Sequence, residues 1–398
     1  MAGAALLSGG ATGCLSSGSP LRTTTTDAPV ETPDSMQYQY DAQNSGLATA
    51  APPESNTVRW QTQIPPISGL VVANDRVLCS EYGKLAALDA HTGEELWRVR
   101  VGHDTDAPPA VIGDTVYVTT SNGGESVDRG VVALSLEDGS KQWRAIPDVD
   151  ITSSPTVVDD TVYVGSAEHE DPSKGVLALD RSDGTVQWQF EADEGITTPA
   201  VDDGTVYVGG TVYVDGVEQS VLYGLDAETG EELWRLQLRG EGMNGAPTVV
   251  DDTVYVTRLW HLHAIDATDG TKKWSTRLPR NSRTHASVVV TDDSIYVPAE
   301  DLFVAFDTEG NERWSVEMTG AEFAPTVAGD SIVVADANTA YCFDAEDGTE
   351  LWRRSAEQRE ISDMGFTRMG SAPVAAGSVV YVPSQGGDIH ALQNEHES

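Results

Sequence analysis

A nine-residue motif that ends in tryptophan recurs along the chain and limits the folds available to it. The copy DAETGEELW occupies residues 226–234, and close copies are DAHTGEELW (89–97), DATDGTKKW (266–274) and DAEDGTELW (344–352). Looser copies are SLEDGSKQW (135–143), DRSDGTVQW (180–188) and the shorter DTEGNERW (307–314). A sequence that repeats at a period of roughly 40 residues builds one structural unit per repeat.

Each repeat has the pattern of four short strands. In residues 245–274, an apolar run ends at Asp251-Asp252, and the alternating segment 253–257 follows. The run LHAID (262–266) and the tryptophan segment complete the unit. Alternation indicates strands, and aspartate tolerates the left-handed backbone of a tight hairpin turn. We therefore expect four antiparallel strands per repeat.

The number of strands predicts how the repeats close. The first hairpin turn and the third strand each occur eight times, the last third strand being IHALQ (389–393), but the tryptophan motif occurs seven times. The unmatched strand TVRWQTQIP around Trp60 lies at the opposite end of the chain and can complete the last unit. The sequence thus predicts an all-β, eight-bladed β-propeller whose ring is closed by an N-terminal strand. A solenoid would need atypical capping repeats and would leave the complementary ends unexplained.

The charge of the chain is strongly acidic. The 398 residues include 63 acidic and 24 basic side chains, a formal net charge of −39, and only five of the basic residues are lysine. Such a surface repels nucleic acid, so we expect no nucleic-acid partner. An acidic, lysine-poor folded chain is typical of halophilic proteins, since molar salt screens repulsion beyond about 3 Å. The alternative is an ordinary acidic exported protein.

The N-terminus resembles an export signal. MAGAALLSGGATGC ends in a lipobox-like Ala-Thr-Gly-Cys, which predicts lipidation of Cys14, although no basic region precedes it. We interpret it as a truncated signal, with a start further upstream and export possibly by the twin-arginine route. The alternative is an incidental cysteine. The expected segments are a signal remnant (1–14), a disordered Ser/Thr/Pro-rich tether (15–35), a lead-in segment (36–59), the propeller (60–393) and a tail (394–398).

Two further cysteines, Cys79 and Cys342, lie in strand-like runs. They could pair in an extracellular protein, but small buried apolar roles are favoured. No Cys/His cluster has metal-ligand spacing, so we expect no metal site.

The motif resembles a known family. The pattern A-x-D-x-x-T-G-x-x-x-W, complete at 87–97 and with Gly224 for the alanine at 224–234, is similar to the tryptophan-docking motif of quinoprotein alcohol dehydrogenase-like propellers. The resemblance covers residues 60–393. It implies that eight tryptophans pack between neighbouring blades in a structural role: Trp60, Trp97, Trp143, Trp188, Trp234, Trp274, Trp314 and Trp352. Trp260 lies outside the motif and is either a surface-contact or a packing residue.

The family contains both enzymes and scaffolds. Its dehydrogenases carry a vicinal Cys–Cys disulfide against pyrroloquinoline quinone (PQQ) and bind calcium, whereas this chain has no adjacent cysteines. The resemblance therefore favours the non-catalytic members, which include BamB-like lipoproteins and archaeal lipoproteins with PQQ-like repeats. We expect no catalytic residues, PQQ or calcium, and a monomeric, lipid-anchored, protein-binding scaffold on the outer face of the cell membrane. The alternative is a quinone- or small-ligand-binding, possibly redox-active protein.

One sector of the chain is basic. The segment STRLPRNSRTH (275–285) contains three arginines and no acid, and we expect it to form a loop between blades. We predict an acidic partner surface at a basic sector formed by Arg239, Arg258, Arg277, Arg280, Arg283 and His285, since guanidinium groups bind carboxylates in pairs. The alternative is local ion pairing with neighbouring acids.

Overall fold

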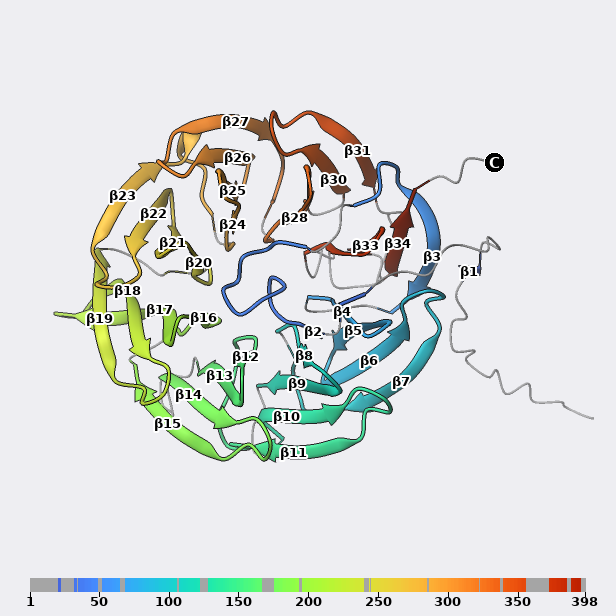
Figure 1. Cartoon of the computed structure of the whole chain (residues 1–398), viewed down its shortest axis with the longest axis horizontal. Helices are drawn as coiled ribbons and strands as arrows, with labels where there is room; N and C mark the ends of the chain where they lie inside the picture. The colour runs from blue at the N-terminus through green and yellow to red at the C-terminus, as the bar shows by residue number, and fades with distance from the viewer. Residues whose placement is uncertain are drawn as a thin grey trace, which may run out of the picture.

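Eight small antiparallel sheets form a ring around a central axis in a computed structural model of the chain (Figure 1). The structure describes residues 21–22, 32–33, 35–48, 52–64, 69–105, 107–121, 128–166, 175–192, 195–239, 243, 245–284, 286–321, 323–336, 339–355, 372–384 and 388–394. The predicted all-β, eight-bladed propeller is confirmed.

Blades 1 to 8 follow the chain, and strands are given from the axis outward. Blade 1 comprises β4 (Val71–Ala73), β5 (Arg76–Glu81), β6 (Lys84–Asp89) and β7 (Glu95–Arg100), and blade 2 comprises β8 (Ala110–Ile112), β9 (Thr115–Thr120), β10 (Gly130–Ser135) and β11 (Lys141–Ala145). Blade 3 comprises β12 (Thr156–Val158), β13 (Thr161–Ser166), β14 (Gly175–Asp180) and β15 (Val186–Glu191), and blade 4 comprises β16 (Ala200–Asp202), β17 (Thr205–Val214), β18 (Val217–Asp226) and β19 (Glu232–Arg239). Blade 5 comprises β20 (Thr248–Val250), β21 (Thr253–Arg258), β22 (His261–Asp266) and β23 (Lys272–Arg277). Blade 6 comprises β24 (Val289–Val290), β25 (Ser294–Pro298), β26 (Leu302–Asp307) and β27 (Glu312–Glu317). Blade 7 comprises β28 (Thr326–Ala328), β29 (Ser331–Ala335), β30 (Thr339–Asp344) and β31 (Glu350–Ser355). Blade 8 comprises β32 (Val374–Ala376), β33 (Val379–Ser384), β34 (Asp388–Gln393) and β3 (Thr57–Gln63).

The N-terminal strand closes the ring, as the strand count predicts. β3 pairs antiparallel with β34, with Trp60 opposite Ala391, and Trp60 is only 2% exposed. The short β1 (Leu21–Arg22), which falls in the expected tether, adds to the outer edge of β3. Both ends of the repeat array therefore share one sheet, so the apolar faces that the end blades of a linear array would expose are packed against neighbouring blades.

The two faces of the ring carry different connections. Turns between first and second strands and between third and fourth strands lie on one face, here called the turn face. The connections between second and third strands and between blades lie on the other, the loop face. On the turn face, Asp251 and Asp252 have φ angles of 47° and 55°, the left-handed conformation expected at a tight hairpin.

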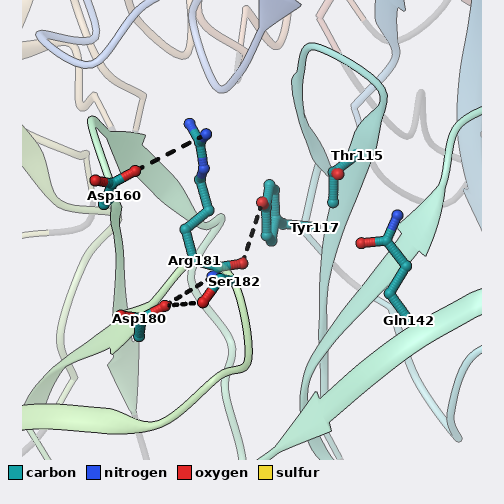
Figure 2. Close-up of a pocket in the computed structure, with 7 residues that line it drawn as sticks. All are labelled: Thr115, Tyr117, Gln142, Asp160, Asp180, Arg181 and Ser182. Atoms are coloured by element: carbon teal, nitrogen blue, oxygen red, sulfur yellow. Dashed lines mark hydrogen bonds and ion pairs between the residues drawn. The ribbon is translucent and has the colours of Figure 1, made fainter.

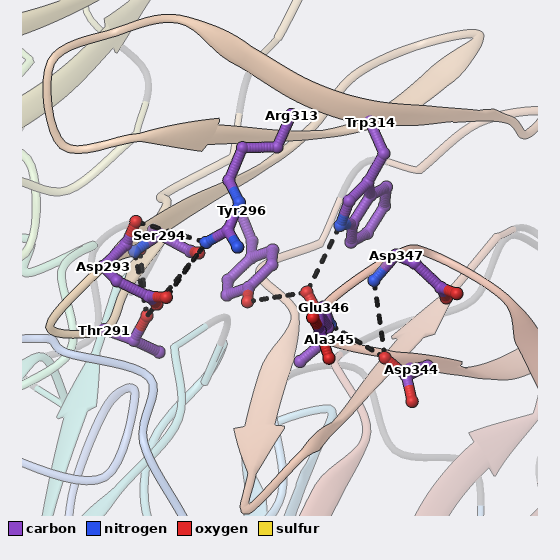
Figure 3. Close-up of polar contacts among 10 residues, drawn as sticks. All are labelled: Thr291, Asp293, Ser294, Tyr296, Arg313, Trp314, Asp344, Ala345, Glu346 and Asp347. Carbon is purple, nitrogen blue, oxygen red and sulfur yellow. Dashed lines mark hydrogen bonds and ion pairs between the residues drawn. The ribbon is translucent and has the colours of Figure 1, made fainter.

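Each repeat tryptophan joins its blade to the next one. At the junction of blades 2 and 3, Trp143 Nε1 and the Tyr117 hydroxyl both donate to the carbonyl of Arg181, and Figure 2 shows the tyrosine contact. At the junction of blades 6 and 7, Trp314 Nε1 and the Tyr296 hydroxyl converge in the same way on Ala345 (Figure 3). The eight indoles donate to the carbonyls of Ala90, Leu136, Arg181, Ala227, Ala267, Thr308, Ala345 and Pro53.

The glycine of the motif is required by the position of that indole. Gly93 has φ +73°, and a Cβ built on it would lie 2.6 Å from a ring carbon of Trp60. Asp89 shapes the same turn, because its carboxylate accepts from the backbone N–H of Thr92 at 2.8 Å. The repeated motif is thus a turn that its own aspartate stabilises. It offers a carbonyl that accepts the indole N–H, and its glycine leaves room for the indole ring.

The first part of the lead-in segment lies inside the ring (Figure 1), whereas residues 57–59 belong to the outer strand β3 of blade 8. Residues 35–48, here called the axial segment, begin with β2 (Ser35–Met36), which pairs with β8 of blade 2. Together with Pro33 just before it, the segment hydrogen-bonds the innermost strand, or its adjoining turn, in the seven other blades. The backbone N–H groups that donate to this stretch are those of Asn74, Val157, Val201, Val249, Val290, Val327 and Ala375.

Blade 4 departs from the repeat. β17 and β18 are ten residues long each, and their paired ends meet at a turn around Asp215 and Gly216. The resulting ribbon projects beyond the ring at the left of Figure 1. Its tip exposes Tyr213, Val214 and Val217.

Candidate functional site

Arg258 and Arg277 of the basic sector lie at the loop-face edge of blade 5, Arg280 and Arg283 lie in the loop that leads to blade 6, and Arg239 is the last residue of β19 in blade 4. Arg258 and Arg277 are the last residues of β21 and β23, and His261 of β22 is the register partner of both. The expectation that 275–285 forms one loop is therefore wrong for residues 275–277, because their backbone continues the ladder with β22. The side chain of Arg239 and the whole of His285 lie outside the described residues.

Arg283 and Trp260 form the main side-chain contact on this surface. The guanidinium carbon of Arg283 lies 5.6 Å from the centre of the indole, a cation–π distance, and Trp260 is half-buried. Two backbone hydrogen bonds join the segment that carries Trp260 to the loop that carries Arg283. Thr284 N–H donates to the carbonyl of Leu259 at 2.8 Å, and Leu278 N–H donates to the carbonyl of Trp260 at 2.8 Å. Leu259 has φ 50°, a strained conformation for a bulky residue. Trp260 is thus partly exposed and packs against Arg283, so both of the roles open to it, surface contact and packing, agree with its position.

The arginines differ in their partners. Arg280 forms an ion pair with Glu317 at 2.6 Å, so local ion pairing accounts for this residue. Arg258 Nε donates to Ser220 Oγ of blade 4 at 3.2 Å. Among the residues that the structure describes, neither Arg277 nor Arg283 has a carboxylate within 4.0 Å. Among the described side chains of the sector, Arg277 and Arg283 are exposed and lack such a carboxylate partner.

Two histidines on β22 lie beside these arginines, and the sequence analysis does not identify them. The rings of His261 and His263 stack with centroids 5.8 Å apart. Burial, followed by the positive charges of Lys272 and other neighbours, lowers the pKa of His263 to about 3. Burial and the nearby Arg277 also lower the pKa of His261. At neutral pH the histidines are therefore neutral, and arginines carry the charge of the sector.

A polar groove of about 390 Å³ lies on the turn face between blades 2 and 3 (Figure 2). Ser182 at its edge donates to Asp180, and that bond lowers the pKa of the Asp180 carboxyl. A carboxylate held in this way is a weak base, and Thr229 contacts Asp226 in the same manner in blade 4. The Ser–Asp contact is a repeated turn cap and does not activate a nucleophile.

The remaining titratable groups show no arrangement for metal or thiol chemistry. Within the described ranges, no group of three or more His, Cys, Asp or Glu side chains could hold a metal ion. Cys79 in blade 1 and Cys342 in blade 7 are free and buried, so of the two alternatives the unpaired, apolar role applies. Burial raises the pKa of Cys342 to about 12, which keeps it a thiol. Cys14 lies outside the described residues.

The axial segment occupies the middle of the ring, and its Asn44 is fully buried. The ring groups that contact the segment are backbone amides, carbonyls and small side chains, with Asp202 as the charged one among the described contacts. A polyanionic quinone needs cationic partners, and no described contact in the axis supplies one.

In the part of the chain with assigned structure, no helix is long and apolar enough to cross a bilayer.

These features define a PQQ-like repeat β-propeller with one basic sector on its loop face. The family model described as outer membrane protein assembly factor BamB matches residues 43–194, 173–298 and 261–396. The chain belongs to this family. No curated protein gives a significant match.

Solved structures share the fold at low identity. BamB from Moraxella catarrhalis is 18% identical, with a TM-score of 0.63, over 85% of this chain and 100% of that one. Quinohemoprotein alcohol dehydrogenase from Comamonas testosteroni is 13% identical, with a TM-score of 0.72, over 89% of this chain and 80% of that one. The designed protein Ika8 is 15% identical, with a TM-score of 0.66, over 88% and 99%. Assembly factors, enzymes and a designed ring thus share one architecture, and function depends on the site.

Proposed function

We propose that this protein is a non-catalytic scaffold that binds other proteins through the loop face of blade 5. The observation that carries the proposal is the stacked pair of Arg283 and Trp260. Tryptophan and arginine are the residues most enriched at the energetic centres of protein interfaces. Membership of the family described as BamB supports the same function.

The partner that suits this surface is an acidic protein. Arg277 and Arg283 present guanidinium groups to solvent, and such groups bind carboxylates in bidentate geometry. The net charge of −39 opposes association with nucleic acid, and it also makes the basic sector the most favourable place for an acidic partner to approach.

Photo-crosslinking tests the docking surface. A photoreactive benzoylphenylalanine at position 260 should capture a partner in the membranes of the native cell, and the triple variant Arg277→Ser, Arg280→Ser and Arg283→Ser should reduce that capture at least tenfold. The matched control is Arg235→Ser, Arg313→Ser and Arg353→Ser, which removes the same charge from ion-paired positions on outer strands. Equal capture by both triple variants would contradict the docking proposal.

The location is also part of the proposal. We propose that Cys14 carries a lipid that holds the monomeric ring at the outer face of the cell membrane, after export possibly by the twin-arginine route. The wild-type chain should then sediment with membranes and Cys14→Ser should not. Membrane association that is unchanged in Cys14→Ser would contradict the anchor.

We propose further that the protein uses neither PQQ nor calcium. Purified protein mixed with both should show the absorbance spectrum of the free quinone and no dehydrogenase activity with alcohols. A protein-dependent spectral shift that requires calcium would favour the alternative of a quinone-binding protein.

A further inference from the structure

The axial segment has the properties of a folded ligand. It is held together by its own hydrogen bonds: Gly46 N–H donates to Gln39 at 3.0 Å and Tyr40 N–H donates to Gln37 at 2.9 Å. Asp41, the one charged residue in the segment, accepts from both the backbone N–H and the hydroxyl of Ser45. The segment therefore provides hydrogen-bond partners for its own carboxylate and brings a compact loop with a single charged residue into the ring.

The ring receives this loop through polar backbone groups. Asn44 Nδ2 donates to the carbonyls of Pro199 at 3.2 Å and Pro247 at 3.0 Å, which precede the innermost strands of blades 4 and 5. In the opposite direction, Val201 N–H donates to Ala42 at 2.7 Å and Val249 N–H to Gln43 at 3.0 Å. The lining thus offers alternating donors and acceptors, which is the chemistry that binds a peptide by its main chain.

Shape adds selectivity to these hydrogen bonds. Gly46 has φ +76°, and a Cβ on it would overlap the side chain of Val289 in blade 6. The Tyr40 hydroxyl donates to Thr326 of blade 7 at 3.2 Å and accepts from Ala375 N–H of blade 8 at 2.7 Å. A loop that binds in the axis must therefore have glycine at the position of Gly46 and tyrosine at the position of Tyr40.

The ring is closed without the axial segment. β3 forms a ladder of six pairs with β34, and Trp60 docks on Ala90 at the rim. The segment adds a ladder of only two pairs, between β2 and β8, with the other blades contacted by separate hydrogen bonds. Such a contact resembles a peptide complex more than a strand of the sheet.

We propose that the axial channel is a peptide-binding site that the chain fills with its own residues 35–48. The site recognises an amide-rich loop with the pattern Tyr-Asp-x-x-Asn-Ser-Gly, in which the aspartate is hydrogen-bonded within the loop. A second copy of this chain can supply that loop when the covalent connection to β3 is cut, and the occupied channel is closed to other axial ligands.

An exchange experiment tests this site. A protease recognition sequence is inserted at residues 49–51 of the full chain, and the purified protein is cleaved and mixed with excess fluorescent peptide of residues 32–48. We expect the cleaved chain to keep its circular dichroism spectrum and to take up the peptide in a one-to-one ratio. The uncleaved chain should take up less than a tenth of that amount.

Peptide variants give the specificity. Asn44→Ala in the peptide should weaken uptake at least tenfold, whereas Leu47→Ala, at an exposed position, should bind like the parent. Unfolding or aggregation on cleavage would show that the segment is part of the fold rather than an occupant. Equal uptake by the uncleaved chain, no uptake by the cleaved chain, or equal uptake of the Asn44→Ala peptide would also overturn the proposal. None of these results involves the arginines of blade 5, so the docking function is tested separately.

Discussion

The outer rim of this ring, where the repeat tryptophans join neighbouring blades, and its axis are held together by different kinds of contact. At the rim, one contact is repeated eight times, with an indole N–H on one blade and a turn carbonyl on the next, except that Pro53 supplies the carbonyl for Trp352. At the axis, one segment contacts all eight blades, and each contact is different. The rim distributes stability over many similar units, whereas the axis concentrates it in a single stretch of chain.

The comparison indicates which changes the ring tolerates. A rim contact involves two neighbouring blades, so its loss affects one junction. An axial residue such as Asn44 bridges two blades through neutral hydrogen bonds, each of which contributes about 0.5–1.5 kcal/mol. Single changes at the rim should therefore cost more stability than single changes at the axis, because large aromatic side chains are buried there.

The largest effect is expected when both regions are lost at once. Deletion of residues 1–64 removes β3, Trp60 and the axial segment, so blade 8 exposes an unpaired strand and the channel opens. We expect aggregation by size-exclusion chromatography and loss of the folded circular dichroism spectrum. Deletion of residues 1–30 should leave a folded monomer. A stable, monomeric 65–398 fragment would contradict ring closure by β3.

Removal of one docking tryptophan should be the largest single-residue effect. Trp234 is 8% exposed and donates to Ala267 of blade 5. Trp234→Ala should lower the free energy of unfolding by about 3–5 kcal/mol in a denaturant titration. Trp260→Ala, at a half-exposed position outside the motif, should cost less than about 1 kcal/mol. Equal costs would mean that the repeated tryptophans have no special place in the rim.

A pair of glycines separates the indole contact from the backbone conformation. Gly230 and Gly204 both have φ +73°, but a Cβ on Gly230 would lie 2.5 Å from the Trp188 ring, and a Cβ on Gly204 would meet nothing within 4 Å. Gly204→Ala should cost about 1–2 kcal/mol of unfolding free energy, the usual penalty of a left-handed alanine. Gly230→Ala should cost measurably more in the same titration. Similar losses at both positions would show that the turn, and not the tryptophan, selects glycine.

A single polar change at the axis is expected to cost less than the loss of a docking tryptophan. Asn44→Ala leaves the carbonyls of Pro199 and Pro247 without this donor and should lower the free energy of unfolding by about 1–3 kcal/mol. Leu47→Ala, at a position 37% exposed, should change it by less than about 0.5 kcal/mol. If Asn44→Ala proved as harmless as Leu47→Ala, the axial contacts would not contribute to stability.

The sequence predicts the rim well and the axis poorly. The tryptophan motif and the Asp-Asp turns are local patterns that can be found in the sequence. The strand around Trp60 can be identified as the closing strand because the last repeat, at the C-terminus, lacks a tryptophan strand. The axial contacts join residues such as Asn44 and Pro247 that are 203 positions apart, and no periodicity marks them. The same limit applies to the site: arginines cluster visibly in sequence, but the strand position of Arg277 and the His261–His263 pair depend on register.

The ribbon of blade 4 was readable in part. Alternation continues through Thr211–Val214, and Asp215-Gly216 is a strong hairpin signal. The repeat period alone does not predict this extension, because the second strands of the other blades are five or six residues long.

Hydrogen exchange at the inner strands tests most directly whether the chain fills its own axis. The amides of Val201, Val249 and Val327 donate to carbonyls of the axial segment at 2.7, 3.0 and 3.1 Å. We predict that these three amides exchange slowly in the intact chain, because the segment shields them from water. They should exchange much faster in Asn44→Ala, while the amides that pair β18 with β19 keep their protection. Exchange of the three valine amides in the intact chain at the rate of exposed loop residues would contradict an occupied axis.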